Sequence, residues 1–180
     1  MAGELIIDLV RHMKARNRLK WGEDDDARPL SKLGLRQAEM HAVVMAGGGA
    51  IAAVYSSPAL RCRQTMGPLA KRLGIDVRIE PLLAETRLLA SLPGGAENPL
   101  LSMLREAFPD GGRVVACSHG DTIPAFLDSL NVPVDGALGM EQGWSLPAVL
   151  KGFGGWYRVR VAGDDVRIER IDVPAGFPRE

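Results

Sequence analysis

The chain has 180 residues, of which 46% are hydrophobic and 24% charged, and this composition is typical of one globular domain, residues 1–180. Its 22 basic and 22 acidic residues balance, which argues against nucleic acid or an anionic membrane as a partner. Any anion site must therefore be local. Cys62 and Cys117 form no disulfide framework, and Glu4 and Asp8 interrupt the apolar amino-terminal stretch. We therefore expect a cytoplasmic protein with reduced thiols, no secretory signal and no membrane span.

Residues 6–12 begin as a short apolar run and end in Arg11 and His12. Such a run is typical of a strand that is buried on both faces of a parallel sheet. In open α/β sheets, ligands bind just beyond the carboxyl ends of the strands, which is where Arg11 and His12 would lie. Arginine binds phosphate through a planar pair of donors, and histidine can act as a nucleophile or a proton carrier. The pair therefore predicts an anion site at this strand end.

A polar segment, residues 13–26, follows and is predicted to form a loop over this site. Its first part is basic, and we consider Lys14, Arg16 and Arg18 as candidates for contact with an anionic substrate. The ordinary role of such a basic run is a solvated surface. Residues 23–26 are acidic, but no histidine lies nearby and the ligand spacing is not that of a known site, so a solvated turn is favoured over a metal site.

The first predicted helix begins after Ser31, a residue suited to the N-cap position. Leu33, Leu35 and Ala42 recur at helical spacing and form its predicted apolar face. The glycines at residues 47–49 end it. His41 falls inside this helix and is assigned no functional role.

A second strand, predicted at residues 50–55, leads through Pro58 into a second helix that ends at Gly74. Arg61 and Arg63 cannot both face the sheet, because two residues turn a helix through about 200°. Arg61 lies in the first turn and is the better candidate for the mouth of the sheet. Arg63 is predicted to be a surface residue.

The remaining predicted elements continue the alternation of strands and helices. They are strands at residues 75–79 and 113–117, helices at 100–108 and 123–130, and further strands at 144–150, 155–161 and 164–172. This alternation predicts an α/β fold with a mostly parallel central sheet. His119 comes directly after the strand at 113–117.

Three predicted strands thus deliver basic residues at or just past their carboxyl ends: Arg11 with His12, Arg61, and His119. In a parallel sheet these ends line one crevice, and two arginines with two histidines make a positive pocket of the size of a phosphate. Phosphoryl transfer needs charge neutralisation, a nucleophile in line and an acid for the leaving atom. His12 is the predicted nucleophile, since the adjacent Arg11 should lower the pKa of the imidazole and keep it neutral.

These residues also carry a family resemblance. The motifs are Leu9-Val10-Arg11-His12, then Ser56-Ser57-Pro58-Ala59-Leu60-Arg61 with Gln64-Thr65, and finally Ser118-His119-Gly120. In this order they resemble the signature of the histidine phosphatase superfamily, also called phosphoglycerate mutase-like, over about residues 5–130. The resemblance implies a three-layer α/β/α sandwich and a phosphatase that uses no metal and no other cofactor. It also implies that His12 is transiently phosphorylated and that Arg11, Arg61 and His119 bind the phosphate.

One position departs from the family pattern, because Met13 stands where glycine is usual. With Lys14 and residues 26–30, this departure is similar to the small bacterial phosphohistidine phosphatases. The chain is more similar still to the phosphatase half of some two-domain Nudix proteins, through Arg61-Cys62, Pro68-Leu69 and Cys117-Ser118-His119-Gly120-Asp121. No Nudix half is present in the sequence.

The proton donor is the role with two candidates. Many family members place a glutamate after the third strand, and Glu85 in Leu83-Ala84-Glu85-Thr86 matches that place. Asp121, two residues after His119, is the second candidate. A general acid must reach the leaving atom, and this requirement favours Glu85.

The leading hypothesis is therefore a metal-independent phosphohydrolase that works through phospho-His12. A phosphoglycerate-type mutase is a second hypothesis, and the short loop between Glu85 and Leu100 argues against it. A third is an inactive phosphate-binding module, which the presence of all four core residues disfavours. The substrate stays open between a phosphorylated small molecule, such as a nucleotide or sugar phosphate, and a phosphohistidine protein. The oligomeric state also stays open.

Overall fold

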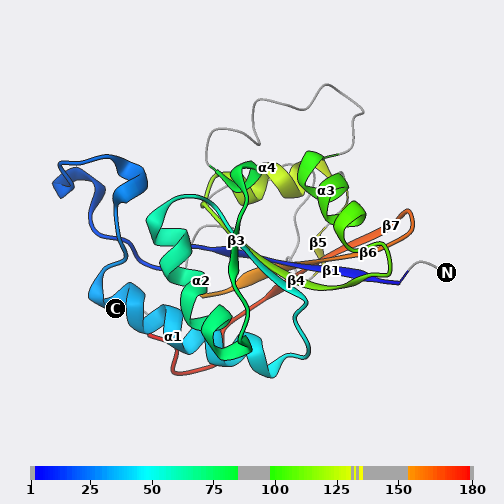
Figure 1. The fold of residues 1–180 in the computed structure, drawn as a ribbon, viewed down its shortest axis with the longest axis horizontal. Coiled ribbons are helices and arrows are strands. Elements are labelled where there is room, and N and C mark those ends of the chain that lie inside the picture. Colours follow the sequence, from blue (N-terminus) through cyan, green and yellow to red (C-terminus); the bar gives the residue numbers. More distant parts are fainter. Residues whose placement is uncertain (1–2, 85–97, 131, 133, 136–153, 179–180) are drawn as a thin grey trace.

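The structure, a computed structural model, describes residues 3–84, 98–130, 132, 134–135 and 154–178 (Figure 1). Its strands are β1 (Leu5–Arg11), β2 (Ala53–Ser56), β3 (Val77–Ile79), β4 (Gly112–Ser118), β5 (Val134–Asp135), β6 (Trp156–Ala162) and β7 (Asp165–Ile171). Its α-helices are α1 (Lys32–Gly47), α2 (Leu60–Leu73), α3 (Pro99–Ala107) and α4 (Thr122–Ser129). Three short 3₁₀ helices are η1 (Arg18–Lys20), η2 (Asp25–Ala27) and η3 (Pro81–Leu83).

The strands form one sheet in the order β3-β2-β4-β1-β6-β7-β5. The neighbouring strands β3, β2, β4 and β1 are all parallel. On its other side β1 pairs antiparallel with β6, which in turn pairs antiparallel with β7, and β5 runs parallel to β7. The predicted α/β class with a parallel central sheet is confirmed. The half that carries the predicted site is the parallel half.

Helices cover both faces of this sheet, so the predicted three-layer sandwich is confirmed (Figure 1). On one face α1 and α2 enclose a core that includes Val10, Met45 and Leu69. On the other face α3 and α4 enclose a second core that includes Leu104 and Phe126. The central strands are buried on both faces, which is why their sequences read as continuous apolar runs.

Helix α1 begins as predicted, because the Ser31 side chain accepts a hydrogen bond from the Gly34 amide. Its buried face differs from the predicted one. Leu35 is 46% exposed, whereas His41 is fully buried. The cause is Gly34, which lies so close to the backbone of Lys14 that a side chain there would overlap the Lys14 carbonyl. This contact turns the Gly34 side of the helix inward and Leu35 outward.

Helix α2 also follows the sequence closely. Its N-cap is Ala59, so Pro58 precedes the helix rather than standing in its first turn. The C-cap, Gly74, adopts the left-handed conformation with φ 67°, as expected for glycine at this position. Arg61 points into the protein and is fully buried, while Arg63 is exposed, as predicted.

A buried carboxylate joins the two halves of the sheet. Asp8, in the middle of β1, is fully buried on the α1 and α2 side. It accepts hydrogen bonds from Arg113 Nε of β4 and from Arg158 Nε of β6, both at 2.7 Å. A terminal nitrogen of Arg158 donates a further bond of 3.0 Å, and Trp156 Nε1 donates one of 3.1 Å. A buried charge needs such partners, since an unpaired carboxylate in a protein interior costs several kcal/mol, on the order of a folded domain's whole stability.

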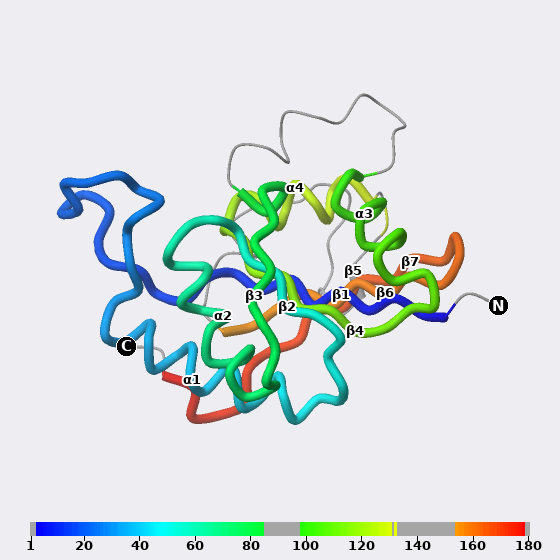
Figure 2. Tube along the Cα trace, viewed as in Figure 1, coloured from blue at the N-terminus to red at the C-terminus, as the bar shows by residue number. Residues whose placement is uncertain are grey.

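Strands β6 and β7 form a hairpin that extends the sheet beyond β1, shown in orange in Figure 2. They match the strands predicted at residues 155–161 and 164–172. The strand predicted at residues 144–150 lies outside the described residues. Among the described residues no helix is both long and apolar enough to cross a membrane.

Candidate active site

The strand ends that carry the predicted site residues meet at one edge of the sheet. The register of β1 and β4 pairs Arg11 with Ser118. His12 and His119 are the next residues of these neighbouring strands, so they lie side by side where the strands end. Their rings face each other edge-on, with centroids 5.5 Å apart. Arg61 enters from the first turn of α2, and one of its terminal nitrogens lies 3.2 Å from His119 Nδ1. The structure thus brings His12, Arg61 and His119 together, and Arg11 lies at the same end of β1.

His12 is buried, and its hydrogen bond defines its reactive nitrogen. The Nδ1 atom lies 2.8 Å from the carbonyl oxygen of Met13. A carbonyl only accepts hydrogen bonds, so Nδ1 carries the ring hydrogen and Nε2 holds the available electron pair. Burial lowers the pKa of His12 to about 3, and the positive charges of Arg61 and Arg11 add to the effect. At neutral pH His12 is therefore a neutral imidazole with a nucleophilic Nε2.

His119 is oriented by partners on both ring nitrogens. The guanidinium of Arg61 only donates, so His119 Nδ1 accepts and the ring hydrogen lies on Nε2. Nε2 donates in turn to Ser57 Oγ at 2.9 Å. Cys62 Sγ, a buried thiol, lies 3.7 Å from the same nitrogen. Both ring nitrogens of His119 are therefore engaged within the protein, one by Arg61 and the other by Ser57.

Arg11 is half-buried at the end of β1. Burial lowers the pKa of its guanidinium, and the nearby carboxylate of Asp121 partly opposes this shift. An arginine stays charged in proteins, so Arg11 and Arg61 both bring permanent positive charge to the edge where His12 lies. The charge is local, as the balanced composition requires.

Helix α2 binds the chain that follows His12. Thr65 Oγ1 accepts a hydrogen bond of 3.0 Å from the Met13 amide and donates one of 2.7 Å to the Arg61 carbonyl. The Met13 side chain is fully buried in the α1 and α2 core, which accounts for an apolar residue at this position. Gln64 Oε1 accepts from the Leu30 amide at 2.8 Å. The backbone around His12 is therefore held to the helix that supplies Arg61.

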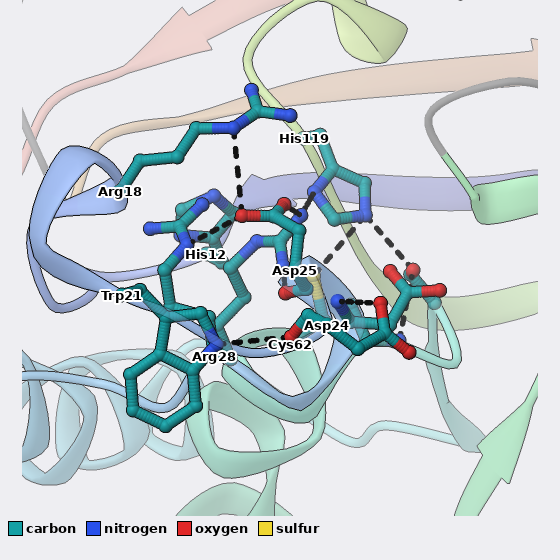
Figure 3. A network of polar contacts seen from close by, with 12 residues as sticks. His12, Arg18, Trp21, Asp24, Asp25, Arg28, Cys62 and His119 are labelled. Carbon is teal, nitrogen blue, oxygen red and sulfur yellow. Dashed lines mark hydrogen bonds and ion pairs between the residues drawn. The ribbon is translucent and has the colours of Figure 1, made fainter.

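The segment between β1 and α1, residues 14–30, lies over the site as predicted and projects beyond the helices in blue (Figure 2). Its turn at η2 brings the Asp25 carboxylate between three arginines, as Figure 3 shows for Arg18 and Arg28. Asp25 Oδ1 lies 2.8 Å from Arg28 Nε and 3.5 Å from Arg18 Nε. Asp25 Oδ2 lies 3.2 Å from Arg61. The prediction of a solvated acidic turn is wrong for Asp25, because the arginines draw this carboxylate inward.

The further predicted residues have different outcomes. Arg18 reaches the mouth of the site through Asp25, although its side chain is 67% exposed. The side chain of Lys14 is exposed and makes no hydrogen bond or ion pair within the described part of the chain. Asp121 caps α4, with Oδ1 accepting from the Thr122 amide at 2.9 Å. Glu85 lies outside the described residues.

Two residues of the site were not predicted from the sequence. Asp25 stood in an acidic run without an evident partner, and only the arginine three residues later, Arg28, signalled a local ion pair. Ser57 belonged to a recognised motif but was given no role, although its hydroxyl bonds His119. Among the described residues, no group of three or more His, Cys, Asp or Glu side chains is arranged to hold a metal ion.

Residues 7–90 match the sequence model of the histidine phosphatase superfamily, branch 1, and this range contains Arg11, His12 and Arg61. The chain is also 33% identical over 120 residues to an 8-oxo-(d)GTP phosphatase of Mycolicibacterium smegmatis. The chain belongs to the histidine phosphatase superfamily. The match with the Mycolicibacterium protein covers 67% of this chain but only 35% of that protein, so the chain spans about a third of the length of this relative.

Solved structures of this superfamily share the fold over nearly the whole chain. A candidate phosphohistidine phosphatase, SixA, of Nakamurella multipartitia has a TM-score of 0.65 at 22% identity, covering 97% of this chain and 99% of that one. A mycobacterial glucosyl-3-phosphoglycerate phosphatase has a TM-score of 0.63 at 25% identity, covering 96% of this chain and 98% of that one. These two proteins therefore share the overall fold of this chain.

Proposed function

We propose that this histidine phosphatase is a phosphohydrolase that works without a metal, through a covalent phospho-His12 intermediate. The observation that carries the proposal is the hydrogen bond from His12 Nδ1 to the Met13 carbonyl, at 2.8 Å. It leaves Nε2 as the nucleophilic nitrogen of a neutral ring. Arg11, Arg61 and His119, all within the same edge of the sheet, supply the charge and donors for the phosphoryl oxygens.

The reaction has two steps. In the first, His12 Nε2 forms a bond to phosphorus while the bond from phosphorus to the leaving atom breaks, and the leaving atom takes a proton. In the second, water attacks the phosphorus of phospho-His12, the P–N bond breaks, and inorganic phosphate leaves. The arginines neutralise the phosphoryl oxygens in both transition states, which is the role that a metal has in other phosphatases.

The proton donor for the first step is proposed to be Glu85. Ser118 Oγ donates a hydrogen bond of 2.7 Å to the carbonyl of Leu83, so the chain two residues before Glu85 is attached beside His119. Two residues of chain span at most about 7 Å, which limits how far residue 85 can lie from that point. Asp121 stays the alternative donor, but its carboxylate already caps α4.

Hydrolysis is favoured over a mutase reaction and over phosphate binding without catalysis. The relatives and neighbouring structures are named as phosphatases, which supports a hydrolase rather than a mutase. An inactive phosphate-binding module is disfavoured, because Arg11, His12, Arg61 and His119 are all present and close together. The same names suggest the substrate class, either a phosphorylated small molecule or a phosphohistidine protein. The buried, unpaired thiols of Cys62 and Cys117 support a cytoplasmic location.

The test is the phosphoenzyme itself. After mixing with p-nitrophenyl phosphate, the protein is expected to carry phosphate that is labile in acid and stable in alkali, as a phosphoimidazole is. His12→Asn should lose both this phosphate and the release of nitrophenol. His41→Phe, which removes an imidazole on the buried face of α1 and outside the site, is the matched control and should keep both. Turnover by His12→Asn at the wild-type rate would overturn the proposal.

A further inference from the structure

The guanidinium of Arg61 is completely enclosed. Its side chain is 0% exposed, although the proposed reaction requires it to bind a phosphoryl group. One terminal nitrogen donates to the backbone carbonyl of Asp25 at 2.7 Å, and the other lies 3.2 Å from Asp25 Oδ2. The second nitrogen also bonds His119 Nδ1. The turn that carries Asp25 therefore covers Arg61 through both its backbone and its carboxylate.

This turn is ordered by its own bonds. Asp24 Oδ1 accepts from the Asp26 amide at 3.1 Å, and the Asp24 carbonyl accepts from Trp21 Nε1 at 3.0 Å (Figure 3). Arg28 Nε holds Asp25 Oδ1 at 2.8 Å, and this bond is the main reason why the pKa of Asp25 lies below its usual value. Asp25 is therefore ionised at neutral pH and is a poor general acid. It is an anion that the protein itself presents to Arg61.

The base of the segment is attached separately from its tip. Ala15 and Leu30 form a β-bridge, and the Arg16 amide donates to the Pro29 carbonyl at 3.0 Å. Gln64 binds the Leu30 amide from α2. Across the tip, by contrast, the contact with Arg61 is made by Asp25. The turn can therefore leave Arg61 while the ends of the segment stay in place next to His12 and α1.

We infer that Asp25 competes with the phosphoryl group for Arg61, so that the turn leaves Arg61 when a substrate binds and returns as inorganic phosphate departs. Carboxylate and phosphate oxygens are equivalent acceptors for a guanidinium, and the enclosed Arg61 has no exposed surface to offer a second anion. The inference rests on the proposed function. It assigns Asp25 the role of a product-release residue, since the internal anion lowers the affinity for the free phosphate.

An alternative role for Asp25 predicts the opposite change in phosphate affinity when the residue is replaced. If Asp25 only positioned Arg61 and stayed bound beside the phosphoryl group, its removal would weaken phosphate binding. If Asp25 competes, loss of its carboxylate charge destabilises a closed state that does not bind phosphate, although Arg61 can still donate to the Asp25 carbonyl. The apparent affinity for phosphate then rises as the population of the closed state falls. The direction of the change therefore decides between the two.

The experiment is calorimetric titration of the full chain with inorganic phosphate. Asp25→Asn is expected to bind phosphate about fivefold to tenfold more tightly than wild type, the size of a closed state populated at about 80–90%. Asp26→Asn is the matched control, because it removes the same charge from the same turn, and Asp26 is exposed and has no ion pair within the described residues. Its phosphate affinity should stay within about twofold of wild type, the effect of a screened surface charge.

The outcomes separate the inference from the proposed function. Phosphate binding by wild type that weakens, or stays equal, in Asp25→Asn overturns the competition and leaves the phosphatase assignment standing. Absence of phosphate binding in all the variants overturns both. If Asp25→Asn does not fold, as judged by its thermal unfolding, Asp25→Ser is used in the same titration with the same expected sign.

Discussion

The proposed attack of His12 on phosphorus and the proposed protonation of the leaving atom make separate demands on the chain. The first demand concerns His12 alone, whose pKa of about 3 keeps the imidazole neutral over the physiological range. The second depends on the substrate. An alkoxide has a high pKa and must be protonated as it leaves, whereas a nitrophenolate leaves without help. The identity of the acid can therefore be tested by changing the leaving group.

Glu85→Gln is expected to lower the rate on an alkyl phosphate by about 10²–10⁴-fold, the usual contribution of a general acid. The loss on p-nitrophenyl phosphate should be much smaller. The measurement is the pair of rate ratios, variant to wild type, on the two substrates. A small loss on both, together with a large loss in Asp121→Asn on the alkyl phosphate, would move the acid to Asp121. Equal large losses on both substrates would mean that Glu85 supports the site rather than donating a proton.

The site residues differ in how far the sequence predicted them. Arg11, His12, Arg61 and His119 could be predicted because each follows a buried strand or opens a helix, and parallel strands bring such positions to one edge. Asp25 could not, since its position depends on contacts between a turn and residues distant in the sequence. The Arg61 guanidinium, 36 residues away, is one of them. Periodicity carries no information about contacts of that kind.

At the scale of elements, α1 and the segment before it are fitted to each other through Gly34. An ideal Cβ at this position would lie 2.1 Å from the carbonyl oxygen of Lys14, a backbone atom that cannot turn aside. Gly34→Ala should therefore destabilise the protein by about 2 kcal/mol or more, as overpacked sites do. It should also reduce turnover, because Lys14 is two residues from His12. Urea unfolding and the rate on p-nitrophenyl phosphate measure the two effects.

Gly67→Ala is the matched control for this substitution. Gly67 also lies inside a helix, α2, but a Cβ there meets nothing within 4 Å. Alanine is the better helix former by about 1 kcal/mol, so this variant should be as stable as wild type or more stable, with unchanged turnover. Similar stability of the two variants would show that the backbone of residues 13–15 gives way to the added methyl group.

The elements themselves were predicted well where local signals act. Ser31, Gly74 and the apolar run at residues 113–117 defined the start of α1, the end of α2 and the bounds of β4 nearly to the residue, whereas β2 begins three residues later than predicted. The buried face of α1 was not predicted, since Leu35 is exposed and His41 is buried. The cause is the close approach of Gly34 to the backbone of Lys14, which sets the orientation of the helix. Hydrophobic spacing assumes that the more apolar side chain faces inward, and a close contact of two backbones overrides it.

On the scale of the whole molecule, the buried imidazole of His41 makes stability depend on pH. Its ring meets Trp156 edge-on at 5.5 Å, and burial lowers its pKa from 6.5 to about 4, although the charge of Asp8 opposes the shift. Neither ring nitrogen has a hydrogen-bond partner among the described residues. Below pH 6.5 the imidazole of His41 is protonated in the unfolded chain, but in the folded chain it stays neutral down to about pH 4. The free energy of unfolding therefore decreases as the pH falls from 6.5 to about 4.

His41→Phe is expected to remove this part of the pH dependence while keeping a ring against Trp156. Between about pH 7 and pH 5, wild type should lose about 2 kcal/mol of unfolding free energy on account of His41. The variant should lose that much less, as measured by urea unfolding at the two pH values. His12, with its own lowered pKa, contributes a similar loss that His12→Asn should remove independently. Equal losses in wild type and His41→Phe would contradict the buried, neutral state of His41.

The ion pairs of Asp8 can form only after distant parts of the chain have been synthesised. The carboxylate belongs to the first strand, and its partner Arg158 follows 150 residues later. Until β6 emerges from the ribosome, β1 has Arg113 on one side and no counter-ion on the other. In a nascent chain that ends before residue 156, we expect the Asp8 carboxylate to stay hydrated and the β6 side of β1 to stay unpaired. The β6–β7 hairpin would then complete the charge pairing of a residue that is translated 150 residues earlier.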